Sequence, residues 1–254
     1  MNLQLLKLLA LNKGKGYFKA EASAESATIY LYDAIVADDY WGGVSALSFA
    51  KELATIDSPD IHLRINCPGG DVFAARAMAQ AMKEHPSNIT VHIDGYAASA
   101  ATFLVTAADK SVISEGGMFM IHNAWTVAGG NAKDFIETAA LLSKTDQSIC
   151  NDYLAKTGQT EQQIKDWMDA ETYFYGQEAV DAGFVDSLAE ISSKNSINWD
   201  LSAYAHAPVN KVPKPAYLPA EKPEPDPKPS PTTLEPIDLS NHYRRLELIN
   251  KTAS

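Results

Sequence analysis

Hydrophobic and polar positions follow two periods along the first two hundred residues. Residues 61–65 and 89–93 place an apolar side chain at every second position, which predicts strands with one buried face. Residues 71–85 place apolar side chains three or four positions apart, which predicts a helix with one buried stripe. The alternation of such strands and helices indicates an α/β fold. The same criteria predict further strands at 27–32, 111–113, 118–121 and 184–188, and further helices at 43–53, 98–108, 131–156, 160–170 and 178–182.

Proline separates this patterned part from the end of the chain. Three prolines precede residue 208, and the other ten lie in 208–236. Because proline lacks an N–H donor and fixes φ, these residues predict an extended, proline-rich tether. Apolar residues at helical spacing then predict a short helix within 239–249. The chain is therefore divided into an N-terminal segment at 1–26, a globular domain at 27–202, a linker at 203–238 and a short C-terminal helix or tail at 239–254.

Composition and charge narrow the classes of protein to which the chain can belong. Of its 254 residues, 46% are hydrophobic and 21% are charged, which is ordinary for a globular protein. The net charge of −11 argues against a general nucleic-acid or acidic-membrane binder. Cys67 and Cys150 show no metal-ligand spacing, so we expect neither a metal nor a cofactor. The apolar N-terminal run is short, contains Lys7 and lacks a signal-peptide layout, so we expect a cytoplasmic protein without a membrane span.

A turn of small residues at 94–101 holds the first candidate for chemistry. The sequence DGYAASAA leaves the predicted strand at 89–93 and enters an apolar helix, with Ser99 at the junction. A serine there can lie beside the free N–H groups of a helix N-terminus, which stabilise developing negative charge. Serine is also a common helix-starting residue, so Ser99 is a candidate nucleophile only together with other groups.

Three further segments could supply those groups. Paired glycines in INCPGGDV, at 65–72, let the backbone approach a ligand closely, although a plain tight turn also needs glycine. His122 ends a predicted strand and could accept a proton from a serine, although a lone histidine is often an ordinary surface or core residue. Asp169 or Glu171 could orient that histidine, or could belong to a solvated turn.

The order and spacing of these segments resemble the proteolytic subunit of the Clp protease family. The resemblance covers about residues 27–188, and five segments carry it: INCPGGDV, DGYAASAATFL, MIHNA, KTGQTEQQI and EAVDAGFVDSL. It implies a ClpP/crotonase-like spiral of repeated ββα units, followed here by an extended proline-rich C-terminal tail. It also implies a serine endopeptidase that acts on peptides or proteins and assembles into a ring-shaped homo-oligomer.

The resemblance also implies roles for individual residues. It makes Ser99 the nucleophile, His122 the general base, and the backbone N–H groups of Gly70 and Ala100 the oxyanion hole. Counting without a gap between the flanking motifs places the acid of the triad at Glu171, with Asp169 as the alternative. The positions that the resemblance assigns to substrate binding are Gly69, Gly70, Asp71, Val72 and Asn123.

Some segments depart from the general family. Cys67 stands where the family has serine before its Pro-Gly-Gly, and we can match neither the family's N-terminal segment nor the hydrophobic pocket that docks its ATPase partner. Residues 29–45 and 199–202 instead resemble the Clp-like proteases of tailed phages and prophages, which process capsid or scaffold proteins during head assembly. This narrower resemblance implies such a substrate, met in the cytoplasm of a bacterial host or within the prohead.

Three other functions stay open from the sequence. The chain could be a general Clp proteolytic subunit that works with an ATPase partner. It could be an acyl-CoA enzyme of the crotonase superfamily, which shares the fold and the paired N–H groups but needs no serine–histidine pair. It could also be a non-catalytic ring or scaffold protein whose proline-rich tail recruits capsid subunits.

Overall fold

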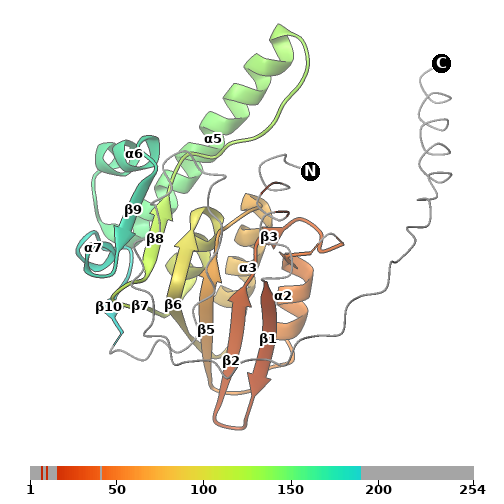
Figure 1. Ribbon diagram of the computed structural model, residues 1–254, viewed down its shortest axis with the longest axis vertical. Helices are drawn as coiled ribbons and strands as arrows, with labels where there is room; N and C mark the ends of the chain where they lie inside the picture. The colour runs from red at the N-terminus through yellow and green to blue at the C-terminus, as the bar shows by residue number, and fades with distance from the viewer. Residues whose placement is uncertain (1–6, 8–9, 11–15, 41, 190–254) are drawn as a thin grey trace, which may run out of the picture. The chain divides into compact units, whose positions relative to one another are not determined.

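The structure, a computed structural model, describes residues 7, 10, 16–40 and 42–189 (Figure 1). The predicted linker at 203–238 and the predicted C-terminal helix or tail at 239–254 lie outside the described residues, as does the segment at 199–202. Among the helices that are described, none combines the length and the apolar character that crossing a membrane requires.

One mixed sheet forms the centre of the described part. Its strands lie in the order β1-β2-β5-β6-β7-β10, and β8 pairs with both β6 and β9. β1 and β9 run antiparallel to their neighbours, whereas the other pairs in the sheet are parallel. The strands are β1 (Tyr17–Ala22), β2 (Ser26–Tyr32), β5 (Asp60–Cys67), β6 (Asn88–Ala98), β7 (Lys110–Ile113), β8 (Met118–Ile121), β9 (Thr172–Tyr175) and β10 (Ser187–Leu188), and a separate small pair comprises β3 (Ile35–Val36) and β4 (Val44–Ser45).

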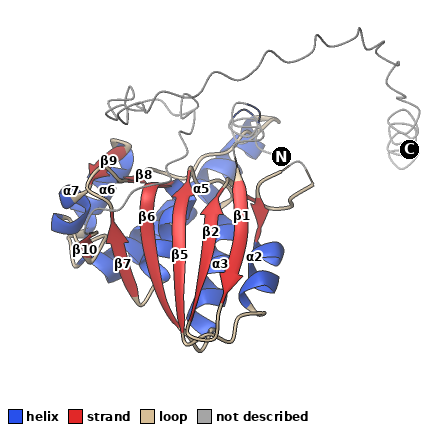
Figure 2. Cartoon of the chain, turned by 60° about the horizontal axis from the view of Figure 1, so that its bottom comes forward, coloured by secondary structure: helices blue, strands red, loops and turns tan. Residues whose placement is uncertain are grey.

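Helices pack against the sheet and close its hydrophobic core. Figure 2 shows α2 and α3 side by side against one face of the strands. The buried stripe of α3, which includes Met78 and Met82, belongs to one core with the buried alternate positions of the strands, such as Leu63 and Val91. The helices are α2 (Ala46–Leu53), α3 (Val72–Glu84), α4 (Thr102–Ala107), α5 (Ala132–Thr157), α6 (Glu161–Asp169) and α7 (Gln177–Asp181), and a 3-10 turn, η1 (Ser99–Ala101), precedes α4.

Capping residues define the start of α3 and both ends of α5, the two longest of these helices. The Asp71 carboxylate accepts a hydrogen bond of 2.8 Å from the Ala74 N–H, so α3 begins directly after the glycine turn. Asn131 and Asp134 form a capping box at the start of α5, and Gly158 ends that helix with a φ of 68°. The ends predicted from the sequence lie within one residue of these positions.

The predicted α/β pattern is confirmed, with local differences. β1, which pairs with β2, lies within the residues that the sequence assigns to an N-terminal segment. The strand was not predicted, because its sequence YFKAEA lacks a long apolar run. The helix predicted at 43–53 begins at Ala46, because Ser45 caps it after the short strand β4. The strand predicted at 184–188 is confined to Ser187–Leu188, because Phe184 turns into the core before the chain pairs with β7.

The long helix α5 has two unlike halves. Figure 1 shows its N-terminal part extending beyond the sheet. In that part Phe135, Ile136 and Leu141 are 52%, 70% and 60% exposed, whereas Ile149 and Tyr153 in the C-terminal part are buried. Within the described part of the chain, only the C-terminal half of α5 therefore contributes to the core.

Candidate active site

The candidate nucleophile lies where β6 ends. β6 continues to Ala98, and the helix predicted at 98–108 consists of the 3-10 turn η1 followed by α4. Ser99, the first residue of η1, has a φ of 54°. This left-handed conformation costs a non-glycine residue about 1–3 kcal/mol and concentrates at functional sites. The hydroxyl is thus held at a strained turn at the carboxyl end of the central strand.

The glycine pair packs directly against this turn. A Cβ on Gly69 would lie 2.4 Å from the carbonyl oxygen of Ala98, and a Cβ on Gly70 would lie 1.9 Å from that of Ile35. Both glycines also have a positive φ, 86° and 143° respectively. No other residue fits at either position, so the bare backbone of Gly69 approaches Ser99 closely, and that of Gly70 approaches Ile35. The glycines therefore do more than complete a tight turn.

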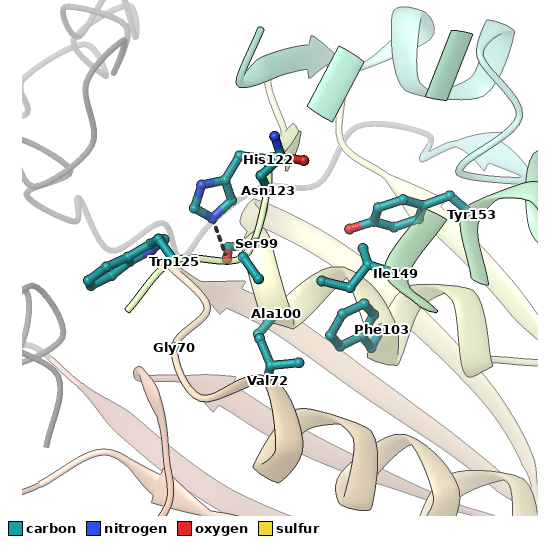
Figure 3. Close-up of a pocket in the computed structure, with 11 residues that line it drawn as sticks. Gly70, Val72, Ser99, Ala100, Phe103, His122, Asn123, Trp125, Ile149 and Tyr153 are labelled. Carbon is teal, nitrogen blue, oxygen red and sulfur yellow. Dashed lines mark hydrogen bonds between the residues drawn. The ribbon is translucent and has the colours of Figure 1, made fainter. Parts of the chain in front are cut away.

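Ser99 and His122 form a hydrogen-bonded pair. The distance from Ser99 Oγ to His122 Nε2 is 2.7 Å (Figure 3). The two residues meet because β6 and β8 are neighbouring parallel strands, with Ala98 opposite Met120, and both residues follow the carboxyl ends of those strands. A histidine nitrogen at this distance can take the proton of the hydroxyl.

Burial controls the charge of this histidine. It lowers the pKa of His122 below its ordinary value, and the nearby charge of Glu171 acts in the opposite direction. The lowering predominates, so the imidazole is neutral at neutral pH and able to act as a base. A neutral ring that accepts from Ser99 at Nε2 carries its proton on Nδ1, the atom that faces Glu171.

Glu171, rather than Asp169, lies beside His122. Glu171 Oε2 is 4.0 Å from His122 Nδ1, and the two side chains are 14% and 10% exposed. Asp169 Oδ1 instead accepts a hydrogen bond of 2.7 Å from Asn123 Nδ2. Of the two acids that the sequence leaves open, Glu171 has the geometry to orient the imidazole.

The backbone of Glu171 resembles that of Ser99 in one respect. Glu171 follows the last turn of α6, and its φ is 50°. Among the described residues, Ser99 and Glu171 are the two non-glycine residues with a positive φ. The Tyr173 hydroxyl, from β9, donates a hydrogen bond of 2.8 Å to Glu171 Oε1. Strained backbone therefore occurs at both ends of the Ser99–His122–Glu171 arrangement.

A pocket opens beside Ser99, and both polar and apolar groups line it. Figure 3 shows Phe103, Ile149 and Tyr153 on one side of Ser99, and Trp125 on the other. Phe103, Ile149 and Trp125 offer apolar contacts to a bound peptide, and the polar groups of His122 and Asn123 lie in the same lining. The sequence did not indicate that these residues line a pocket, because they come from α4, from the distant helix α5 and from the loop after His122. The one local signal was the position of Trp125, three residues beyond the histidine.

The positions that the sequence associates with substrate and oxyanion binding divide into two groups. Gly70, Ala100, Val72 and Asn123 line the pocket. Gly69 instead supports Ser99 from behind, since its missing Cβ makes room for the Ser99 Cβ. Asp71 caps α3 and is not among the lining residues.

A buried hydroxyl pair, which no pattern in the sequence indicates, connects the nucleophile turn to α5. Thr102 Oγ1 donates a hydrogen bond of 2.6 Å to the Ser99 carbonyl oxygen and lies 2.7 Å from the Tyr153 hydroxyl. Thr102 and Tyr153 are both fully buried. Because the Thr102 proton is used toward Ser99, the Tyr153 hydroxyl is the donor in the second bond.

The described residues contain no cluster of three or more His, Cys, Asp or Glu side chains placed to hold a metal ion.

Cys67, which precedes the glycine turn, is buried, and burial raises the pKa of its thiol to about 12. The thiol is therefore protonated at neutral pH, and its sulfur accepts a long hydrogen bond of 3.4 Å from the Gly69 N–H. Its place in the site is structural.

Comparisons with known proteins identify the family of this chain. The Clp protease family model matches residues 17–192 and so includes β1. The chain is 34% identical over 141 residues to ATP-dependent Clp protease proteolytic subunit 1 of Leifsonia xyli subsp. xyli, a match that covers 54% of this chain and 72% of the relative. It is 33% identical over 135 residues to proteolytic subunit 2 of Corynebacterium glutamicum (52% and 67% covered) and 35% identical over 131 residues to proteolytic subunit 1 of Corynebacterium jeikeium (51% and 70%). This chain belongs to the Clp protease family.

Proposed function

We propose that the protein is a serine endopeptidase in which Ser99 is the nucleophile, His122 the general base and Glu171 the group that orients the imidazole. The observation that carries the proposal is the 2.7 Å contact between Ser99 Oγ and His122 Nε2 at a strained turn. A serine hydroxyl is a weak nucleophile unless such a base accepts its proton. A crotonase-type enzyme would need the paired N–H groups but not this contact.

The reaction follows from these positions. Ser99 Oγ attacks the peptide carbonyl carbon while His122 Nε2 takes the hydroxyl proton. Negative charge develops on the carbonyl oxygen, which the backbone N–H groups of Gly70 and Ala100 stabilise. His122 then returns the proton to the leaving amine as the C–N bond breaks. A water molecule, deprotonated by His122, finally hydrolyses the acyl-enzyme and restores Ser99.

The test of this proposal compares two serine variants. Ser99→Ala removes the nucleophile, so peptide cleavage and labelling by a fluorophosphonate probe are both lost, while the unfolding temperature stays close to wild type. Ser23→Ala, in the exposed turn between β1 and β2, serves as the matched control and keeps both activities. Labelling or cleavage that persists in Ser99→Ala would exclude the proposal and favour a non-catalytic or acyl-CoA function.

We also propose that the protein acts as a ring-shaped homo-oligomer in which the exposed half of α5 contacts another copy. Phe135, Ile136 and Leu141 lie on a stretch of α5 where the described structure buries no side chain, and their exposed apolar surface is the kind that a protein contact covers. Ile136→Gln should reduce the assembly to smaller species in sedimentation velocity, whereas Lys144→Gln on the same helix should not. Unchanged assembly of the Ile136 variant would exclude this contact.

For the substrate, we propose a capsid or scaffold protein of a phage or prophage, processed in the host cytoplasm or the prohead. The support is the likeness of residues 29–45 and 199–202 to phage-type Clp-like proteases. Mass spectrometry of cleavage products, with wild type against Ser99→Ala and with and without ATP and a Clp ATPase, tests it. Cleavage of capsid or scaffold protein without ATP supports the proposal. Cleavage that requires the ATPase would identify a general Clp proteolytic subunit instead.

A further inference from the structure

The acid end of the site contains a hydroxyl that the proposed mechanism does not use. The Tyr173 hydroxyl donates to Glu171 Oε1 at 2.8 Å, while Glu171 Oε2 faces His122 Nδ1 at 4.0 Å. The two oxygens of one carboxylate are thus directed to two different partners. We propose that Tyr173 is a positioning residue that fixes the Glu171 carboxylate toward His122; this inference rests on the proposed function.

The chemistry of the acid explains why a second anchor is needed. Glutamate has one more methylene and one more rotatable bond than aspartate, and the torsion that turns its carboxylate has a broad energy minimum. Its backbone is set by the left-handed turn after α6, which leaves only the side chain to determine where the oxygens lie. A charge-assisted hydrogen bond from a rigid phenol restricts that rotation.

The strand pairing places Tyr173 correctly for this task. β8 and β9 pair antiparallel, with Met120 opposite Tyr173, so the strand that precedes His122 also fixes the tyrosine. Phe174, the next residue of β9, is buried and packs against Trp167 and Phe184. Because successive side chains of a strand point to opposite faces, Tyr173 points away from this aromatic core and toward Glu171.

The experiment removes one oxygen atom at a time from β9. Tyr173→Phe keeps the ring and deletes the hydroxyl. Tyr175→Phe is the matched control, because Tyr175 lies on the same face of the same strand, two residues further on. We expect Tyr173→Phe to lower kcat about tenfold, with KM within about twofold of wild type and the unfolding temperature unchanged. Tyr175→Phe should leave all three quantities unchanged.

Two readouts separate positioning from simple packing. The Glu171 carboxylate raises the pKa of His122 against the effect of burial, so a misdirected carboxylate should move the acid limb of the kcat profile to lower pH. In a Glu171→Ala background, Tyr173→Phe should cost nothing further, because the tyrosine acts only through that carboxylate.

The outcomes of this experiment distinguish the inference from the function on which it rests. A tenfold loss in Tyr173→Phe that disappears in the Glu171→Ala background supports the inference. A Tyr173→Phe enzyme with wild-type kcat and pH profile overturns it, as does an equal loss with and without Glu171. If Ser99→Ala retains cleavage, the proposed function itself fails; if Ser99→Ala is inactive and Tyr173→Phe is normal, only the inference fails.

Discussion

The Ser99 end and the Glu171 end of the site are held by different means. Around Ser99, glycines without room for a Cβ and a buried backbone bring the hydroxyl within 2.7 Å of Nε2. Around Glu171, a longer acid lies 4.0 Å from Nδ1 and is held by a side-chain hydrogen bond from Tyr173. The group that would form and break bonds is thus fixed by backbone packing. The carboxylate that would orient the imidazole accepts a side-chain hydrogen bond from Tyr173, and the loss of that bond should be tolerated better than a displacement of the backbone at Ser99.

The largest expected changes in kcat come from substituting the base, His122, and the two candidate acids, Glu171 and Asp169. His122→Ala should lower kcat by about 10⁶-fold, because the serine loses its proton acceptor. Glu171→Ala should cost roughly 10³- to 10⁴-fold, because the imidazole remains but is no longer oriented. Asp169→Ala is the matched control for Glu171→Ala and should cost only a few-fold through its contact with Asn123. Steady-state kinetics on a peptide substrate measures all three variants.

The reverse ranking of the acids would contradict this view of the site. If Asp169→Ala were as damaging as expected for Glu171→Ala, the acid would lie on α6 rather than at the turn after it. An equal, small loss from both would mean that the imidazole is oriented by the backbone alone.

The next largest effect concerns the packing behind Ser99. Gly69→Ala would bring a Cβ within 2.4 Å of the Ala98 carbonyl oxygen at a φ of 86°, so the turn must shift. We expect a loss of about 2–4 kcal/mol in the free energy of unfolding and a 10²- to 10³-fold fall in kcat. Gly116→Ala is the control, since nothing lies within 4 Å of the added Cβ. Urea unfolding and peptide kinetics give the two numbers.

A Gly69→Ala protein that loses stability but keeps its kcat would show that the Ser99 end tolerates displacement. That result would remove the distinction drawn between the two ends of the site.

The same contrast explains what the sequence could predict. Ser99 and His122 were identifiable because each lies in a contiguous motif at the end of a predicted strand, and because the order of these motifs resembles a known family. The choice between Asp169 and Glu171 depends on the left-handed turn that ends α6, and spacing alone does not determine that turn. Ile149 and Tyr153 reach the pocket from α5, through tertiary packing that no local pattern encodes. β1 escaped prediction because an edge strand needs little apolar character.

A smaller effect should come from the hydroxyl behind the nucleophile. Thr102→Val has the same shape but removes the donor to the Ser99 carbonyl and the acceptor for Tyr153. We expect a loss of about 1–3 kcal/mol in stability and up to about tenfold in kcat, because a buried hydroxyl of Tyr153 loses its partner. Thr106→Val is the control, one turn further along α4, where the hydroxyl bonds only the Phe103 carbonyl in its own helix. Equal effects of the two variants would mean that the Thr102 bond to Ser99 has no special role.

The smallest expected effect concerns His92, a histidine whose titration should change the free energy of unfolding but not kcat. His92 Nε2 lies 3.1 Å from His62 Nδ1, and burial, with the charges of Arg64, His62 and Lys110, lowers the pKa of His92 to about 4. The unfolded value is about 6.5, so the unfolded chain binds the proton first as the pH falls. This contribution to stability is complete above pH 6.5 and is lost as the pH falls toward 4.

His92→Gln should therefore reduce the loss of unfolding free energy between pH 6.5 and 4, measured by urea titration at several pH values. It should leave the acid limb of the kcat profile in place, because that limb belongs to His122, the histidine that contacts Ser99. Suppose instead that His92→Gln shifts the acid limb and leaves the pH dependence of stability unchanged. The acid limb would then report His92, and its assignment to His122 would be wrong. An unshifted limb would leave Glu171 and its tyrosine as the groups that tune the base.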